Sequence, residues 1–175
     1  MSDVYPPNRP QQGQMGYTTT SQNQDVTYPP NSNFAQMYSV IRENISEIDN
    51  LLSQYTPLPP LPSPPQSDDF GSLSQYYLSF SSYLQQNAQT IDQDYAIMQE
   101  VVDLTSQTMK LAKSLGLTSI YNNLAQLYPQ YQQTLTSLAQ LKKYVKLAGA
   151  YEDLGNAYSV LAQVQQIPNP PNNAS

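Results

Sequence analysis

The sequence predicts an all-α fold: an elongated helical bundle of three to four amphipathic helices, one very long, with a disordered N-terminal arm and a short C-terminal tail. First, residues 34–55 and 70–167 hold nearly all the Leu, Ile, Val, Met and Phe of a chain that is 39% hydrophobic. Within both stretches these side chains recur at steps of three and four residues, the spacing of one helix face. Second, a proline-rich segment at 56–66 separates the two stretches, and proline ends helices because it lacks the amide hydrogen.

The domain boundaries follow from where this periodicity is absent. Residues 1–31 are rich in Pro, Gln, Asn, Thr and Tyr, a composition that predicts a disordered or extended arm. Residues 32–167 are predicted to form the helical bundle domain, with 56–66 as a linker inside it. Residues 168–175 are predicted to be a disordered tail.

The first helix is expected over residues 33–55. Asn31, Ser32 and Asn33 offer side-chain oxygens that can cap its first turn. One apolar stripe runs along it, at Phe34, Met37, Ile41, Ile45, Ile48, Leu52 and Tyr55. The segment "TPLPPLPSPPQ" at 56–66 ends the helix and is expected to be polyproline II, bridging one end of the bundle or running along part of its side.

The second helix is expected over residues 69–115. Ser, Asp and Asp at 67–69 provide a cap and negative charge at its start, and Gly116 provides the stop. Its stripe comprises Phe70, Leu73, Tyr77, Phe80, Leu84, Ala88, Ile91, Tyr95, Met98, Val102, Thr105, Met109 and Ala112. Two successive four-residue steps between 80 and 88 form a stutter in this stripe. Either the helix is unbroken, about 70 Å long at 1.5 Å per residue, or it folds back near Gln85–Gln89.

A third helix is expected to start near Thr118 and to be kinked at Pro129. Its stripe comprises Ile120, Leu124, Leu127, Tyr131, Leu135, Leu138, Leu141, Val145 and Ala148. Either a break at Gly149 separates it from a fourth helix that opens at Glu152, or residues 130–166 form one helix; we favour the break. The residues of the fourth helix expected to face inward are Leu154, Tyr158 and Leu161.

The inventory of reactive side chains disfavours an enzyme. The chain has no Cys, hence no thiol nucleophile or zinc thiolate, and no His, hence no Ser-His pair and no imidazole base or metal ligand. No cofactor and no metal site are therefore expected. The helical carboxylates are expected to form a solvated face rather than a site; they are Asp92, Asp94, Glu100 and Asp103.

Charge and composition also limit the partners. Seven basic against thirteen acidic residues give a net charge of -6, which disfavours nucleic acid because few cations are available for phosphates. Lys142, Lys143 and Lys146 are interpreted as charges at a helix C-terminus. No apolar run reaches the roughly 20 residues of a membrane span, and the first residues do not resemble a secretory signal. Asn44 and Asn173 stand in glycosylation sequons, of which Asn173 is the better acceptor.

Three Pro-Pro-Asn segments lie where helical periodicity is absent: "DVYPPN" at 3–8, "DVTYPPN" at 25–31 and "PNPPNN" at 168–173. We interpret them as segments that mark where the folded part of the chain begins and ends. The alternative is a docking role, because tyrosine beside two prolines is a stiffened, aromatic-tipped peptide. The candidate interaction residues are Tyr5, Pro6, Pro7, Tyr28, Pro29 and Pro30.

The segment "PLPPLPSPP" at 57–65 contains overlapping PxxP frames. It is similar to the Leu-Pro-rich tails by which filament proteins of the ESCRT type recruit their ATPase, and the matching residues are Leu58, Pro59, Leu61 and Pro62. The resemblance implies an adaptor that recruits a protein partner, whereas the simpler interpretation is a linker.

Two further segments, "YNNLAQLY" at 121–128 and "YEDLGNAY" at 151–158, share the pattern Tyr-x-x-Leu-small-x-x-Tyr. The pattern resembles the first helix of a tetratricopeptide repeat. The two copies are 30 residues apart rather than 34, and the positions of a second helix do not match. We interpret the pattern as helix packing through small residues.

The bias of the whole chain towards Tyr, Gln, Asn, Ser, Leu and Ile, with low charge and no Cys, resembles proteins of viruses that infect acidophilic crenarchaea. Many coat proteins of such viruses are helical bundles with extended arms. The resemblance implies a virus-encoded virion component or virion-associated protein, located in the virion or the host cytoplasm. We therefore expect a non-enzymatic structural or assembly protein.

Self-association is expected from the length of the second helix. The first and third helices are each shorter than its stripe, so that one end of the stripe would stay exposed in a monomer unless another subunit covers it. The candidate oligomer stripe comprises Ile91, Tyr95, Met98 and Val102. A second copy of the chain is therefore the expected partner.

Overall fold

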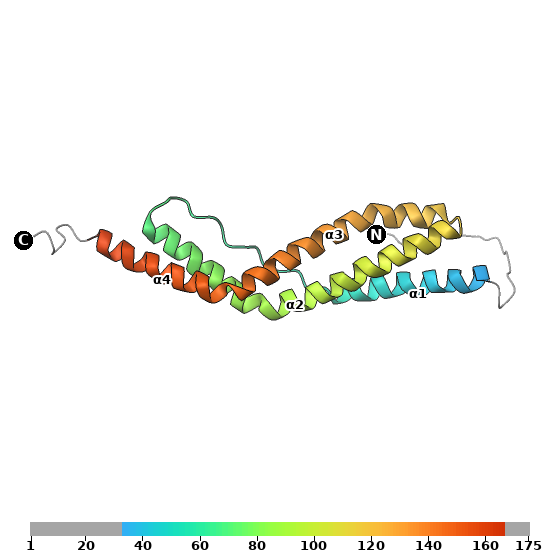
Figure 1. The fold of residues 1–175 in the computed structure, drawn as a ribbon, viewed down its shortest axis with the longest axis horizontal. Helices are drawn as coiled ribbons and strands as arrows, with labels where there is room; N and C mark the ends of the chain where they lie inside the picture. Colours follow the sequence, from blue (N-terminus) through green and yellow to red (C-terminus); the bar gives the residue numbers. More distant parts are fainter. Residues whose placement is uncertain (1–32, 167–175) are drawn as a thin grey trace, which may run out of the picture. The chain divides into compact units, whose positions relative to one another are not determined.

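A computed structural model describes residues 33–166 of the 175-residue chain. These residues form four helices, α1 (Asn33–Gln54), α2 (Phe70–Ser114), α3 (Thr118–Lys146) and α4 (Ala148–Gln165), and no strand lies among them (Figure 1). The predicted all-α class with one very long helix is confirmed. The predicted arm and tail lie outside the described residues, and with them the candidate residues of the two tyrosine-containing Pro-Pro-Asn segments.

The chain divides between Arg42 and Glu43 into two units. In the first unit, the described part of α1 carries the stacked rings of Phe34 and Tyr38, whose centroids are 6.2 Å apart. In the second unit, the rest of α1 contributes Ile48 and Leu51 to a core cluster. The other buried members of that cluster are Met98, Val101 and Leu138.

The long helix α2 is continuous over 45 residues, so the chain does not fold back near Gln85–Gln89. Asp69 caps its first turn by accepting a hydrogen bond from the backbone N–H of Ser72 at 2.8 Å, as the sequence predicts. Beyond its last turn, Gly116 has a φ of 71°, the left-handed conformation that glycine adopts most readily. The predicted stop at Gly116 is therefore confirmed.

Two helices of the same chain share the length of α2 between them (Figure 1). Along the second half of α2, Met98 and Val101 pack against Leu138 of α3. Along the first half, the Phe70 ring stacks on Tyr158 of α4 with centroids 5.8 Å apart. The expectation that one end of the α2 stripe stays exposed in a monomer is therefore wrong, because α3 and α4 follow one another along it.

The switch from α3 to α4 occurs at Leu147, two residues before the predicted break at Gly149. Helix α4 already begins at Ala148, and Gly149 lies within its first turn rather than outside it. A break between the third and fourth helices is confirmed, but it lies at Leu147 and not at Gly149, and the predicted start at Glu152 is wrong by four residues. Helix α3 runs through Pro129 without ending.

The inward face of α4 also differs from the prediction. Tyr158 is half-buried as expected, but Leu154 and Leu161 are 38% and 44% exposed. The residues that α4 buries most deeply are instead Ala148 and Gly155, which are seven residues apart. Small residues occupy this face because the backbones of α2 and α4 approach closely there.

Two serine hydroxyls of α2 join these small residues across the helix pair. Ser74 donates to the carbonyl of Gly155 at 2.8 Å, and Ser81 donates to the carbonyl of Ala148 at 2.7 Å. Both serines are buried, so each hydroxyl needs a partner within the protein. The two serines are seven residues apart, and so are their two partners, but the order along the chain is reversed. Helices α2 and α4 are therefore antiparallel.

Candidate functional site

The segment Tyr55–Gln66, here called the proline strap, runs along α2 rather than hanging free. The backbone N–H of Thr56 donates to Asp94 Oδ1 at 3.0 Å, and Tyr83 donates its hydroxyl to the carbonyl of Pro59 at 2.7 Å. Leu58 packs against the core cluster that contains Met98. Of the four candidate residues in the strap, Leu58 and Pro59 are thus engaged by the chain itself, Pro62 is half-buried and Leu61 is 53% exposed.

An aromatic cluster links α2, the end of α3 and α4. Its centre is Phe80, whose ring lies 5.0 Å from that of Tyr151 and 5.5 Å from that of Tyr144, both edge to face. Tyr77 stacks on both Tyr151 and Tyr158, at 6.1 and 5.9 Å. Ring pairs at such distances contribute about 0.5–1.5 kcal/mol each beyond their buried area.

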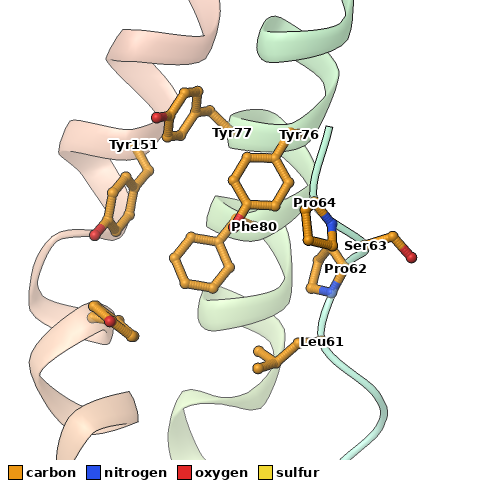
Figure 2. A pocket seen from close by; sticks show the side chains of 9 residues that line it. Leu61, Pro62, Ser63, Pro64, Tyr76, Tyr77, Phe80 and Tyr151 are labelled. Carbon is orange, nitrogen blue, oxygen red and sulfur yellow. The ribbon is translucent and has the colours of Figure 1, made fainter. Parts of the chain in front are cut away.

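A hollow of about 700 Å³ lies between the proline strap and this aromatic cluster (Figure 2). Its lining consists of apolar, proline, serine and tyrosine side chains and includes no charged residue. The polar groups of the lining are the hydroxyls of Ser63 and of the four tyrosines. The lining residues are Leu61, Pro62, Ser63, Pro64, Tyr76, Tyr77, Phe80, Tyr144 and Tyr151.

Asp94 is a buried carboxylate that the sequence assigned to a solvated face. It is 1% exposed, whereas Asp92, Glu100 and Asp103 are exposed as expected. Burial raises the pKa of the Asp94 carboxyl, and the hydrogen bond from Thr56 opposes that shift only in part. The second oxygen, Oδ2, has no hydrogen-bond partner among the described residues.

The Asp94 carboxylate lies near the Tyr55 hydroxyl at the start of the proline strap. Burial, and then the nearby Asp94 charge, raise the pKa of the Tyr55 hydroxyl, so this tyrosine holds its proton more tightly. Among residues 33–166, no group of three Asp or Glu side chains is close enough to hold a metal ion. Asp94 therefore acts as an anchor for the proline strap.

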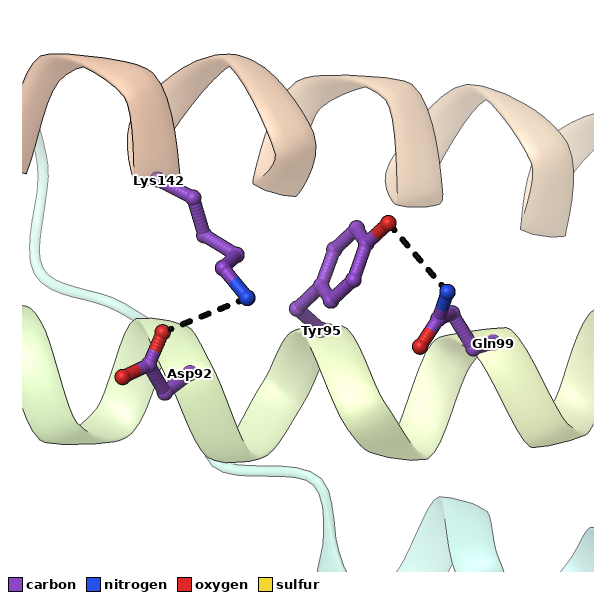
Figure 3. A network of polar contacts seen from close by, with 4 residues as sticks. All are labelled: Asp92, Tyr95, Gln99 and Lys142. Atoms are coloured by element: carbon purple, nitrogen blue, oxygen red, sulfur yellow. Dashed lines mark hydrogen bonds and ion pairs between the residues drawn. The ribbon is translucent and has the colours of Figure 1, made fainter.

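A polar network on the surface joins α3 to α2 (Figure 3). Lys142 Nζ lies 3.5 Å from Asp92 Oδ1 and 4.4 Å from the centre of the Tyr95 ring. Tyr95 in turn accepts a hydrogen bond from the Gln99 amide at 3.2 Å. Lys143 and Lys146 lie in the last turn of α3, as predicted, but Lys142 is part of the helix contact.

The residues of the candidate oligomer stripe lie largely inside the chain. Ile91 and Met98 are 0% and 2% exposed, and Tyr95 and Val102 are half-buried. The stripe therefore packs within the chain as described and presents no broad apolar surface to a second copy. The sequon residue Asn44 is half-buried, with its Nδ2 atom enclosed and without a hydrogen-bond partner among the described residues.

An exposed apolar stripe follows one side of α4 instead. Leu147, Leu154 and Leu161 are 48%, 38% and 44% exposed and recur every seven residues. Ala150, Ala157 and Val164 are also exposed and fall between and after them at steps of three. We call these six residues the α4 seam.

The α4 seam has the alternating three- and four-residue spacing of a coiled-coil interface. This spacing is visible in the sequence, but hydrophobicity favours Leu154 and Leu161 as interior residues. Gly155, next to Leu154, is buried although it has no side chain to indicate an inward face.

None of the helices within residues 33–166 is both long and apolar enough to cross a bilayer. Comparison of the chain with protein-family models, with curated proteins and with solved structures found no match. The function is therefore inferred from the geometry of the chain itself.

Proposed function

We propose that this chain is a non-enzymatic assembly protein that acts through helix–helix self-association. The observation that carries the proposal is the α4 seam, in which Leu147, Leu154, Leu161 and Val164 are 38–54% exposed along one side of one helix. Contiguous apolar surface of this kind on a water-exposed helix is typical of a protein-binding face. A stripe with coiled-coil spacing favours another helix as its partner.

The polar groups of the second unit support a structural role over catalysis. The hollow beside the proline strap lacks charged side chains, and the buried Asp94 holds the strap through Thr56. The ring stacking around Phe80 and the serine contacts at Gly155 and Ala148 serve helix packing. Each of these groups has a structural partner in the same chain.

The more specific part of the proposal is that the assembly is a virion or virion-associated structure. It rests on the compositional resemblance to proteins of viruses of acidophiles and on two properties that suit an acidic medium. Among the described residues a single ion pair, Lys142–Asp92, links two elements, so protonation of carboxylates breaks one such pair. The Asp69 cap, whose pKa the hydrogen bonds from Ser67 and Ser72 lower, also depends on an ionised carboxylate. Burial raises the pKa of the Asp94 carboxyl in the folded state above its value in the unfolded chain. Protonation of Asp94 in acid therefore favours the folded state.

The alternative, an adaptor that recruits a partner through its proline-rich segments, is less well supported. Leu58 packs in the core and the Pro59 carbonyl accepts the Tyr83 hydroxyl. A partner that bound these residues would first have to displace them. Leu61, which is 53% exposed, is the candidate in the proline strap whose side chain a partner could reach most directly without displacing a contact described above.

Three measurements test the proposed function. Size-exclusion chromatography with light scattering, over a hundredfold range of protein concentration, should show mass that rises with concentration. A pull-down with residues 56–66 as bait should recover no specific partner; specific capture would favour the adaptor. Mass spectrometry of purified particles tests the virion assignment, since the chain should be present in stoichiometric amounts.

A further inference from the structure

We infer that the partner of the α4 seam is the α4 seam of a second copy of this chain, and that the two helices pair antiparallel. The inference rests on the proposed function and names its partner, surface and orientation. The seam comprises Leu147, Ala150, Leu154, Ala157, Leu161 and Val164.

The seam occupies one flank of α4, and exposed Val160 lies beside it, between Val164 and the polar flank. At 100° per residue, the seam positions centre roughly 140° around the helix from the face that Gly155 and Ala148 turn towards α2. The flank on the other side is polar and carries Glu152, Asn156 and Gln163, all exposed. An apolar flank opposite a polar flank on a helix that is already packed indicates a second packing surface.

The sizes of the side chains identify the occupant. Large and small residues alternate along the seam, with leucine at 147, 154 and 161 and alanine at 150 and 157. In an antiparallel pair centred between residues 154 and 157, each leucine lies opposite a smaller residue of the other copy. Leu154 meets the second copy's Ala157, Leu161 meets its Ala150, and Leu147 meets its Val164.

This arrangement is self-complementary, as a two-fold symmetric interface requires. A parallel pair would instead place leucine on leucine and alanine on alanine, which leaves gaps at the alanine layers and crowding between them. The pattern of large and small residues thus fits an antiparallel pair of copies better than a parallel pair.

Electrostatics do not oppose the pairing. The charged side chains of α4, Glu152 and Asp153, lie in its first half. An antiparallel pair places them beside the second half of the other copy, where no charged side chain lies between Leu154 and Gln166. Helix α4 is about 27 Å long at 1.5 Å per residue, so the seam contact is small among specific interfaces. We therefore expect a dissociation constant in the micromolar range, roughly 1–100 μM.

Sedimentation velocity on the full chain tests the surface. The double variant Leu154→Glu with Leu161→Glu should be monomeric at concentrations at which the unmodified chain is mostly dimeric. The matched control is Leu127→Glu on α3, because Leu127 has the same 38% exposure as Leu154 but lies outside the seam. The control should dimerise like the unmodified chain, and circular dichroism should show equal helicity for all three.

Cysteine pairing tests the orientation, and the chain has no native cysteine to interfere. Leu154→Cys and Ala157→Cys variants are oxidised separately and as an equal mixture. Antiparallel pairing predicts covalent dimers in the mixture and few in either variant alone, because only residues 154 and 157 face each other. Cross-linking of each variant with itself would indicate parallel pairing and overturn the orientation; no cross-linking in any sample would overturn the pairing.

The outcomes separate this inference from the proposed function. If the unmodified chain assembles but the double glutamate variant assembles equally well, the seam inference is wrong and assembly uses another surface. If the unmodified chain is monomeric at every concentration, both fail. A monomer that dimerises only after removal of residues 1–31 would show that the chain's own N-terminal segment occupies the seam, which also overturns the inference.

Discussion

Gly155 of α4 lies directly against Leu78 of α2: a Cβ atom built at residue 155 would be 2.7 Å from Leu78 Cγ and 3.1 Å from the Leu78 backbone nitrogen. No side chain fits in that space, so glycine is required by the close approach of the two helices rather than by its backbone angles. The same approach brings the Gly155 carbonyl within 2.8 Å of the Ser74 hydroxyl. This contact sets which face of α4 is turned inward and, with it, which face stays exposed.

Replacing Gly155 with Ala should lower the free energy of unfolding by about 1–3 kcal/mol, because the added methyl group forces α4 away from α2. Gly149→Ala is the matched control, since nothing lies within 4 Å of a Cβ at that position. In a helix the control should be neutral or raise stability by about 0.5 kcal/mol. Urea denaturation measures both; equal effects would show that the helices are not in close contact at Gly155.

Asp94→Asn should change how stability depends on pH. The folded-state pKa of Asp94 is raised, so the native protein holds a proton that the unfolded chain releases, above about pH 3.9. The free energy of unfolding of the unmodified chain should therefore fall as pH rises from that value through the raised folded pKa. In Asp94→Asn this contribution should vanish, and denaturation between pH 4 and 7 should show it. Parallel stability curves for the two proteins would contradict the burial of Asp94.

Tyr83→Phe should loosen the proline strap. The change removes the hydroxyl that donates to the Pro59 carbonyl and should cost about 1 kcal/mol. Limited proteolysis should then cut within residues 55–66 faster than in the unmodified chain. Tyr128→Phe serves as control, because no hydrogen bond of its hydroxyl is present among the described residues. If the unmodified strap is cut as fast as the variant, it is not held along α2.

Ile91→Glu and Met98→Glu, together, should unfold the chain rather than only dissolve an oligomer. Both side chains are buried, and an unpaired carboxylate in an apolar core costs several kcal/mol. Circular dichroism should show a large loss of helix, whereas glutamate at Leu154 and Leu161 should leave helicity unchanged. A folded, soluble monomer carrying both core substitutions would show that these residues are not in the core.

The helices could be predicted because their determinants are local. The three- and four-residue spacing, the Asp69 cap, the Gly116 stop and the proline strap each act within a few residues. The stutter between Phe80 and Ala88 was also visible. A stutter allows a fold-back, but in the structure it lies where the partner of α2 changes from α4 to α3, near Ala148.

The inward face of α4 could not be predicted because it depends on a contact between distant residues. Hydrophobicity alone favours Leu154 and Leu161 as buried, and nothing in the local sequence indicates that α2 presents Ser74, Leu78 and Ser81 to glycine and alanine. The burial of Asp94 depends in the same way on Thr56, 38 residues earlier. Long-range packing therefore determines both the burial of Asp94, which anchors the proline strap, and which residues of α4 stay exposed as the α4 seam.

The central claim, that this chain is an assembly protein, is tested most directly by sedimentation equilibrium of the unmodified full-length chain across roughly 1–500 μM, a range that brackets the expected dissociation constant. We expect a weight-average mass that rises from the monomer value of 19.6 kDa towards at least twice that value. A well-folded chain that stays at the monomer mass over the whole range would contradict it.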